Sequence, residues 1–328
     1  MTVPTEQSAT AGERGAQGGA AAAVAPPAAA VRGVRKVFGK TVAVDGIDLE
    51  VPTGSVLGML GPNGSGKTTL IRMLLGLTRP TSGTAELLGH SVPDAAEQAL
   101  PHVGALVEGP GFHPFLSGRE NLRRVAATEP LLASREIADA VGTALERVGL
   151  ADAADRRFRG YSLGMKQRLG LAAALLVPRR LVVLDEPTNG LDPAGTRDVR
   201  RIVAELHAGG ATVLVSSHLL AEVEATCTHV AVLQSGTLVA SGELSTLLEA
   251  GTGGLVVTTP DVDAALEALR GIGATAFREG DGIVVADGGA PAPEIVALLV
   301  RADVAVHEVR RRRARLEELF ARLTEESP

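Results

Sequence analysis

The stretch GPNGSGKTT, residues 61–69, decides the fold of this chain. It follows a continuous apolar segment, SVLGML (55–60), and it precedes KTTLIRMLLGL (67–77), which is apolar on most sides. These flanks predict a buried strand, a glycine-rich turn and a buried helix, which is the context that a phosphate-binding loop requires. Glycines allow backbone N–H groups to turn inward onto phosphate oxygens, and the helix directs its positive end at the anion.

The loop also supplies side chains suited to a nucleotide triphosphate. Lys67 offers a fixed positive charge to the β and γ phosphates, and the hydroxyl of Thr68 can ligate Mg²⁺. The residues expected to contact the nucleotide are Gly61, Pro62, Asn63, Gly64, Ser65, Gly66, Lys67, Thr68 and Thr69. Many unrelated proteins hold phosphates in this way, so the loop alone does not identify the class of protein.

Two adjacent acids end a second apolar strand, LVVLDEP (181–187). Asp185 stands where a carboxylate holds Mg²⁺ in phosphate-loop enzymes. Glu186 follows at once, and a carboxylate beside the bound phosphate can polarise an attacking water. A third apolar strand, ATVLVSSH (211–218), ends in His218. Continuous apolar strands of this kind are typical of a parallel sheet that is buried on both faces.

Composition narrows the class of protein. Hydrophobic residues make up 45% of the 328 residues, which predicts a packed globular core. The net charge of −6 and an aromatic content of 2% argue against a dedicated nucleic-acid partner. A single cysteine, Cys227, excludes an internal disulfide and fits a reducing compartment. The longest clean apolar run, residues 171–177, is far shorter than the roughly 20 residues of a membrane span.

The pattern along the chain divides it into segments. Residues 1–30 are rich in Ala, Gly and Pro, which predicts a disordered tail and no signal peptide. Alternation over 31–51 predicts antiparallel strands, and residues from about 92 to 165 read as amphipathic helices. From residue 249 the pattern restarts as a small βαββαβ unit with strands that include VAVHEV (304–309). A final amphipathic helix follows, so we expect an accessory domain over 249–328.

A third motif indicates the kind of nucleotide-binding protein. The segment YSLGMKQRLGLAAALLV (161–177) resembles the signature sequence of ABC-type ATPases, with Ser162 and Gly164 as its serine and second glycine. NGLDPAG (189–195) resembles the loop after the catalytic glutamate of that family, with Asp192 as its acid. His218 stands at the family's switch histidine, and Phe38 stands where an aromatic ring stacks on adenine.

The resemblance covers about 31–248 and implies a fold and a mechanism. The implied fold is α/β: a three-layer phosphate-loop ATPase core with a mainly parallel sheet, an antiparallel β subdomain, a helical subdomain over about 92–165 and a small α+β C-terminal domain. In the family, two such domains bind head to tail and trap two ATP molecules with Mg²⁺. Glu186, His218 and Lys67 are the implied catalytic residues, and Ser162, Gly164, Phe38 and Asp192 are implied to bind ATP.

The resemblance also implies partners. A second copy of this chain or a paralogue would complete the dimer, and a separate transmembrane permease would hold the subunit at the cytoplasmic face of the cell membrane. The features of the chain are similar to those of the ATPase subunits of antibiotic and multidrug exporters, such as the daunorubicin and bacitracin resistance types. No nucleic acid is expected as a partner, and the transported substrate is not visible in the sequence.

Two positions depart from the family pattern. Leu163 replaces the first signature glycine, so close backbone approach is less free there. Glu108, in LVEGP, stands where the family commonly carries a glutamine that couples the nucleotide to the membrane partner. A carboxylate there can still hold Mg²⁺ or water, so we expect Glu108 to bind ATP and metal and to keep the coupling role.

Alternative functions remain open at this point. A soluble ABC-type ATPase acting on the ribosome or on nucleic acid is one, although the chain has a single phosphate loop and no long coiled coil between its motifs. An ABC importer subunit is another, since the direction of transport rests on subgroup resemblance. A single-domain kinase or GTPase would leave the signature segment and His218 without a purpose.

Overall fold

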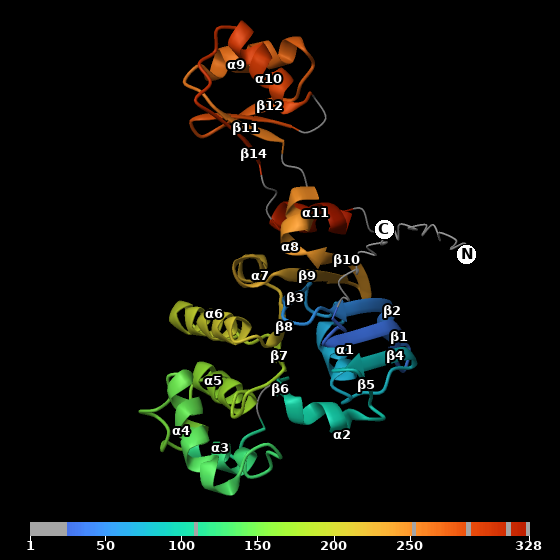
Figure 1. The fold of residues 1–328 in the computed structure, drawn as a ribbon, viewed down its shortest axis with the longest axis vertical. Helices are drawn as coiled ribbons and strands as arrows, with labels where there is room; N and C mark the ends of the chain where they lie inside the picture. The colour runs from blue at the N-terminus through green and yellow to red at the C-terminus, as the bar shows by residue number, and fades with distance from the viewer. Residues whose placement is uncertain (1–24, 108–110, 251–253, 287–289, 313–315, 326–328) are drawn as a thin grey trace, which may run out of the picture.

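The computed structural model describes residues 25–107, 111–250, 254–286, 290–312 and 316–325. Figure 1 shows a large lower body, built on two sheets, and a smaller unit above it with a sheet of its own. The C-terminal helix lies between the two.

The central sheet of the lower body has six strands in the order β10-β9-β3-β8-β7-β6. All its neighbouring strands are parallel except β10, which pairs antiparallel with β9. Every residue of β3 and β7 is buried, as expected for apolar strands covered on both faces. The strands are β3 (Val56–Leu60), β6 (Val103–Leu106), β7 (Leu181–Asp185), β8 (Thr212–Ser217), β9 (His229–Gln234) and β10 (Thr237–Glu243).

Two layers cover this sheet. Helices α5 (Leu163–Ala174), α6 (Pro193–Ala208) and α7 (Leu220–Thr226) lie on one side, and α1 (Lys67–Leu74) lies on the other. An antiparallel sheet, in the order β2-β1-β4-β5, completes the layer that contains α1. Its strands are β1 (Ala29–Phe38), β2 (Thr41–Val51), β4 (Ser82–Leu87) and β5 (His90–Val92).

A helical region follows the antiparallel sheet. It contains α2 (Ala96–Ala99), α3 (Gly118–Ala126) and α4 (Ile137–Arg147), with short 3₁₀ turns at Leu100–His102, Ser134–Glu136 and Phe158–Gly160. Helix α3 begins with a capping box, in which Ser117 accepts from the Glu120 amide and the Glu120 side chain accepts from the Ser117 amide. The expected helical range 92–165 also contains β6, an edge strand of the central sheet. A strand of four residues is too short to show a clear period in the sequence.

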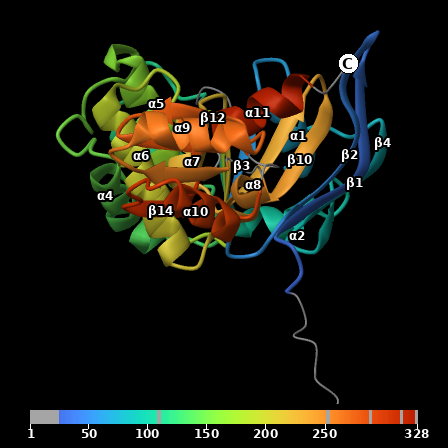
Figure 2. The same cartoon turned by 90° about the horizontal axis from the view of Figure 1, so that it is seen from above.

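The smaller unit is a four-stranded antiparallel sheet in the order β12-β13-β11-β14, with two helices on the face that points away from the lower body (Figures 1 and 2). The predicted strand 304–309 is shifted: Val304 is buried in the core beneath the helices, and the strand begins at Glu308. The elements are β11 (Leu255–Thr258), α9 (Val262–Gly271), β12 (Ala276–Glu279), β13 (Gly282–Val285), α10 (Ala292–Arg301) and β14 (Glu308–Arg311).

Two further helices pack on the lower body next to its antiparallel edge strand. Helix α8 (Leu244–Ala250) precedes the smaller unit in the chain, and α11 (Leu316–Glu325) follows that unit. Leu316 and Leu319 of α11 are buried in one cluster with Leu60, which ends β3, and Val223 of α7. The helix that the sequence placed in the accessory domain therefore contributes to the core beneath the nucleotide loop.

The predicted fold class is confirmed: a phosphate-loop α/β core with an antiparallel β subdomain, a helical subdomain and a small α+β C-terminal unit. The predicted domain boundaries stay a prediction. Among the described helices, none has the length and apolarity needed to cross a membrane.

Replacing Leu316 with alanine is expected to lower the free energy of unfolding by about 2–5 kcal/mol, because its fully buried side chain would leave a cavity. Val300→Ala is a matched control, since Val300 of α10 is 60% exposed and its loss should cost under about 0.5 kcal/mol. Urea titration of both variants measures the difference. Equal stabilities for the two would show that α11 does not dock on the core.

Burial raises the pKa of the Cys227 thiol to about 12. Because the thiolate is the reactive form, roughly one thiol in 10,000 would be ionised near pH 8. We expect slow alkylation in native buffer and rapid alkylation in urea at the same pH, with native labelling rising only as the pH approaches the raised pKa. Labelling at the same rate in both buffers would contradict this expectation.

Candidate nucleotide-binding site

The loop between β3 and α1 depends on its glycines. Gly64 and Gly66 have φ angles of 82° and 103°, in the region that favours glycine. A Cβ atom at Gly61 would lie 2.3 Å from the Leu233 carbonyl oxygen, and one at Gly66 would lie 2.7 Å from the Ala43 carbonyl oxygen. Side chains at these positions are therefore excluded, and the loop stays narrow enough for its backbone to surround an anion.

Ser65 provides a test of whether this cradle fits a phosphate. Its backbone oxygen accepts from the Gly236 amide at 3.1 Å, which ties the loop to the turn between β9 and β10. Its hydroxyl is buried, in a residue that is 2% exposed, and it has no hydrogen-bond partner within the described part of the chain. Buried polar groups are normally paired, so this hydroxyl fits an oxygen supplied by a ligand.

Lys67 begins α1 and is 5% exposed. Its ammonium donates to the Gly61 oxygen at 2.7 Å and to the Pro62 oxygen at 3.1 Å, and it lies 3.7 Å from Glu186 Oε1. These contacts curl the side chain back over the loop that it follows. The positive charge is thereby held at the centre of the cradle.

Asp185 ends β7 beside the start of α1. Its Oδ2 accepts from Thr68 Oγ1 at 2.7 Å, and its Oδ1 accepts from the Ser216 hydroxyl of β8. Since β3, β8 and β7 are neighbouring parallel strands, their carboxyl ends meet at this edge of the sheet. The carboxylate and the Thr68 hydroxyl, predicted from separate motifs, are thus brought together.

Glu186 holds a strained position at the same edge. Its φ is 47°, which is uncommon for a residue with a side chain, and its amide donates to Ser216 Oγ at 2.9 Å. Gln167 of α5 donates to its backbone oxygen at 3.1 Å. The carboxylate lies between Lys67 on one side and His218, whose Nδ1 is 2.8 Å from Glu186 Oε2, on the other.

The residues present fit a divalent cation. Mg²⁺ prefers oxygen ligands and usually keeps water and substrate phosphates in its coordination sphere. Thr68 and Asp185 offer a hydroxyl and a carboxylate 2.7 Å apart beside the phosphate cradle. Among the described residues there is no group of three or more His, Cys, Asp or Glu side chains that could hold a metal alone. A cation held by this pair would still have coordination positions for water and phosphate oxygens.

Phe38 lies at the exposed tip of the β1–β2 hairpin. Its side chain is 50% exposed, and the Lys36 ammonium lies 4.9 Å from the ring centroid. The same hairpin approaches the loop closely, as the contact between Gly66 and Ala43 shows. The ring is exposed next to the cradle, and its stacking on adenine stays a prediction.

The signature segment opens α5. Ser162 caps the helix by accepting from the Met165 amide at 3.2 Å, and it is exposed. Leu163 is 65% exposed and lies against Gly190, where a Cβ would be 2.4 Å from Leu163 Cδ2. Gly164 lies against Leu191, with its ideal Cβ 3.1 Å from Leu191 Cδ2. Leu163 thus packs on the loop that follows Glu186.

One predicted residue, Asp192, makes a contact of a different kind. The Asp192 carboxylate accepts from the Gly195 amide at 2.8 Å and caps α6, so its contact within the chain is structural. Glu108 lies outside the described residues. The strand before it, β6, pairs Leu106 with Leu184, the residue before Asp185, so the chain heads toward the same edge of the sheet.

Sequence reasoning missed three supports of the site. Ser216 contacts both Asp185 and Glu186, and its only signal in the sequence is its place in SSH, two residues before His218. Gln167, in the signature segment, holds the Glu186 backbone. Gly236, in the turn after β9, holds the Ser65 backbone, and no local signal links the two.

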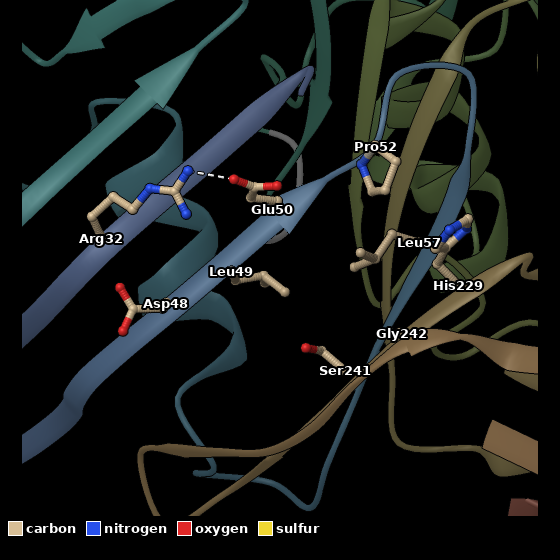
Figure 3. Close-up of a pocket in the computed structure, with 9 residues that line it drawn as sticks. All are labelled: Arg32, Asp48, Leu49, Glu50, Pro52, Leu57, His229, Ser241 and Gly242. Atoms are coloured by element: carbon tan, nitrogen blue, oxygen red, sulfur yellow. Dashed lines mark hydrogen bonds and ion pairs between the residues drawn. The ribbon is translucent and has the colours of Figure 1, made fainter. Parts of the chain in front are cut away.

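A second concavity lies away from these residues, between β1, β2 and the β9–β10 pair (Figure 3). Its volume is about 260 Å³, and Leu57 and His229 face it from adjacent strands. Arg32 and Glu50 at its rim form an ion pair, and Asp48 accepts from the Gly33 amide at 2.8 Å. None of its lining residues is a predicted site residue, and these charged groups already have partners.

The sequence matches a known protein family and relatives within it. The family model described as ABC transporter matches residues 44–189. YdbJ, an uncharacterised ABC transporter ATP-binding protein of Bacillus subtilis, is 38% identical over 302 residues, covering 92% of this chain and 96% of that protein. The daunorubicin resistance ATP-binding protein DrrA3 of Streptomyces coeruleorubidus is 37% identical over 308 residues, covering 92% and 97%.

The fold is also found among solved structures. One described as the ATP binding subunit of an ABC transporter has a TM-score of 0.62 and 26% identity, and it covers 68% of this chain and 92% of its own. The sequence resemblance to ABC-type ATPases is therefore confirmed, and the two sequence relatives extend the similarity over nearly the whole chain.

Lys67→Ala is expected to weaken ATP binding by about 10- to 150-fold with Mg²⁺ present. The change removes a charge-assisted contact worth roughly 1.5–3 kcal/mol, along with the bonds that hold the loop. Equilibrium titration with a fluorescent ATP analogue measures the loss, and Arg301→Ala, on the exposed surface of α10, is the control. Unchanged affinity in Lys67→Ala would mean that this loop is not the nucleotide site.

Proposed function

This chain belongs to the ABC transporter family as an ATP-binding ATPase, and we propose that it powers export of a drug-like, antibiotic or lipid-like molecule through a separate membrane-spanning partner. The observation that carries the proposal is the convergence of Lys67, Asp185, Glu186 and His218 at one edge of the sheet. Similarity to a daunorubicin resistance protein over almost the full chain supports export as the direction.

The chemistry follows from the contacts of Glu186. A general base must lie within hydrogen-bond reach of the water that it activates and must be held in place. Glu186 is anchored through its amide to Ser216 and through its oxygen to Gln167, so its carboxylate faces Lys67 and His218. It would take the proton of a water that attacks the γ phosphate, while His218 keeps the carboxylate oriented.

Lys67 is the group that would exchange partners on binding. In the structure it bonds to loop carbonyls and lies near Glu186, and a γ phosphate would offer its ammonium a stronger anionic partner. That exchange would free the Glu186 carboxylate to receive a proton. A bound Mg²⁺, held by Thr68 and Asp185 with Glu108 as a further predicted ligand, would supply charge neutralisation for the phosphates.

A second subunit would complete the site. The exposed start of α5, with Ser162 and Gly164, presents backbone N–H groups and a positive helix end to the solvent. We place the phosphates of a second copy or a paralogue against it, in a head-to-tail dimer with two ATP molecules. Leu163 and Asp192 would lie at that interface, and Leu163 would limit how closely the backbone approaches.

The proposed membrane-spanning partner is a permease, which is a separate polypeptide chain. The relatives that cover most of this chain are named as ATP-binding proteins of transporters or resistance systems. These names fit a transporter in which one chain binds ATP and another spans the membrane. We place the subunit at the cytoplasmic face of the cell membrane, held there by that permease. An importer subunit or a soluble ATPase of the same family would show no drug efflux when expressed with a candidate exporter permease.

The unit over 249–328 is proposed to be regulatory or stabilising and not catalytic. The predicted site residues all precede it, and its sheet carries its own apolar core. Helix α11 packs on the core beside Leu60, which directly precedes the phosphate loop, so this part of the chain contacts the core next to the proposed nucleotide site. Removing the smaller sheet unit while keeping α11 is therefore expected to alter dimer stability or coupling to the permease more than ATP binding.

Glu186→Gln is expected to bind ATP with near-normal affinity and to hydrolyse it about 10²- to 10⁴-fold more slowly, because the amide cannot accept a proton from water. The trapped nucleotide should also shift the variant to a dimer. Steady-state turnover and light scattering with and without ATP measure both effects.

Glu97→Gln is the matched control, since Glu97 is exposed on α2. Its turnover should equal that of the unaltered protein. Wild-type turnover in Glu186→Gln would remove Glu186 from the role of general base.

A further inference from the structure

Helix α7 carries a carboxylate that contacts two loops of the site. Glu222 Oε2 accepts from Thr188 Oγ1 at 2.7 Å and from Ser217 Oγ at 3.2 Å. Thr188 follows Glu186 by two residues, and Ser217 directly precedes His218. One oxygen atom therefore joins the chain segment of the proposed base to that of its histidine partner.

The same oxygen constrains the backbone on both sides of His218. Ser217 Oγ accepts from the Leu219 amide at 3.0 Å while it donates to Glu222. The loop around the histidine is thus closed by a short hydrogen-bond chain that ends on Glu222. Because His218 itself is 39% exposed, packing alone holds its ring weakly.

The loop after Glu186 is fixed in a similar way. Its backbone forms turns, in which the Asn189 amide donates to the Glu186 oxygen at 3.1 Å and the Leu191 amide donates to the Thr188 oxygen at 3.1 Å. The Thr188 hydroxyl points across to Glu222. That hydrogen bond joins the loop directly to α7.

We propose that Glu222 is a positioning residue that fixes the 2.8 Å contact between His218 and Glu186. It touches neither reacting group, and it acts through Thr188 on one side and Ser217 on the other. The inference rests on the proposed function of Glu186 and His218. It states that Glu222 keeps their side chains at this distance.

The surroundings of Glu222 suit such a role. The groove between α6 and α7 that Thr188, Ser217 and Glu222 line encloses about 20 Å³, close to the room of one water. Arg200 and Cys227 line the same space. Helix α7 is itself held, because Val223 packs against Leu316 and Leu319 of α11. The carboxylate thus has a rigid base and little freedom to move.

The experiment compares Glu222→Ala with Glu222→Gln by steady-state kinetics. Loss of the acceptor should misplace His218 relative to Glu186, and displacements near 1 Å can cost about 10²-fold in rate. We expect Glu222→Ala to lower kcat by about 10- to 100-fold while KM for ATP changes less than about twofold. Glu222→Gln should restore most of kcat, because its amide oxygen can accept both hydroxyl bonds. Glu224→Ala, exposed on the same helix, is the control.

A double-mutant comparison separates positioning from general weakening of the fold. In a His218→Ala background, Glu222→Ala should lower kcat by less than about threefold, because the histidine that it positions is gone. An equal loss in both backgrounds, or a wild-type kcat in Glu222→Ala, would overturn the proposal.

Two further variants decide the question if Glu222→Ala does not fold. Thr188→Val and Ser217→Ala each remove one of the two donors, and each should lower kcat at an unchanged KM; normal kcat in both would overturn the proposal. Failure of the positioning role can be told apart from failure of the proposed function. Slow turnover in Glu186→Gln with normal kcat in Glu222→Ala, or in both donor variants, would refute only the positioning role, whereas normal turnover in Glu186→Gln would refute the role of the base itself.

Discussion

The site depends on one constraint, the burial of β3 and β7 on both faces. Apart from Asp185, which ends β7, their residues are apolar or glycine, so polar groups are placed where the strands end. Parallel neighbours bring these ends to one edge, where Asp185 meets Thr68 and Ser216. The hydrogen bonds among these three residues join β7, α1 and β8 into a rigid frame, and the other site groups attach to that frame.

The second feature of the site is a balance of charge around Lys67. The ammonium is buried among backbone carbonyls and lies 3.7 Å from Glu186, which in turn contacts His218. Buried charges are tolerated when they are paired, so the cluster is stable in a form ready to receive an anion. The strained backbone of Glu186 fits this view, because strain persists where surrounding contacts determine the conformation.

The C-terminal part of the chain is linked to this edge through α7. Helix α11 buries Leu316 and Leu319 against Val223, and the neighbouring Glu222 contacts the loops of Glu186 and His218. The smaller unit with its own sheet lies between α8 and α11 in the chain. Leu244 of α8 and Leu316 of α11 belong to one apolar cluster, so both helices that flank the unit in the chain are anchored to the core.

The sequence by itself determined the phosphate loop, the buried apolar strands and the fold class, because glycine requirements and periodicity are local properties. Motif spacing also singled out Lys67, Asp185 and Glu186, and the resemblance to ABC-type ATPases singled out His218. Only the tertiary structure decided that Ser216, Gln167 and Glu222 support them and that α11 packs under the loop. Those contacts join residues far apart in the chain, and their pairing depends on strand register and helix packing, which local pattern does not encode.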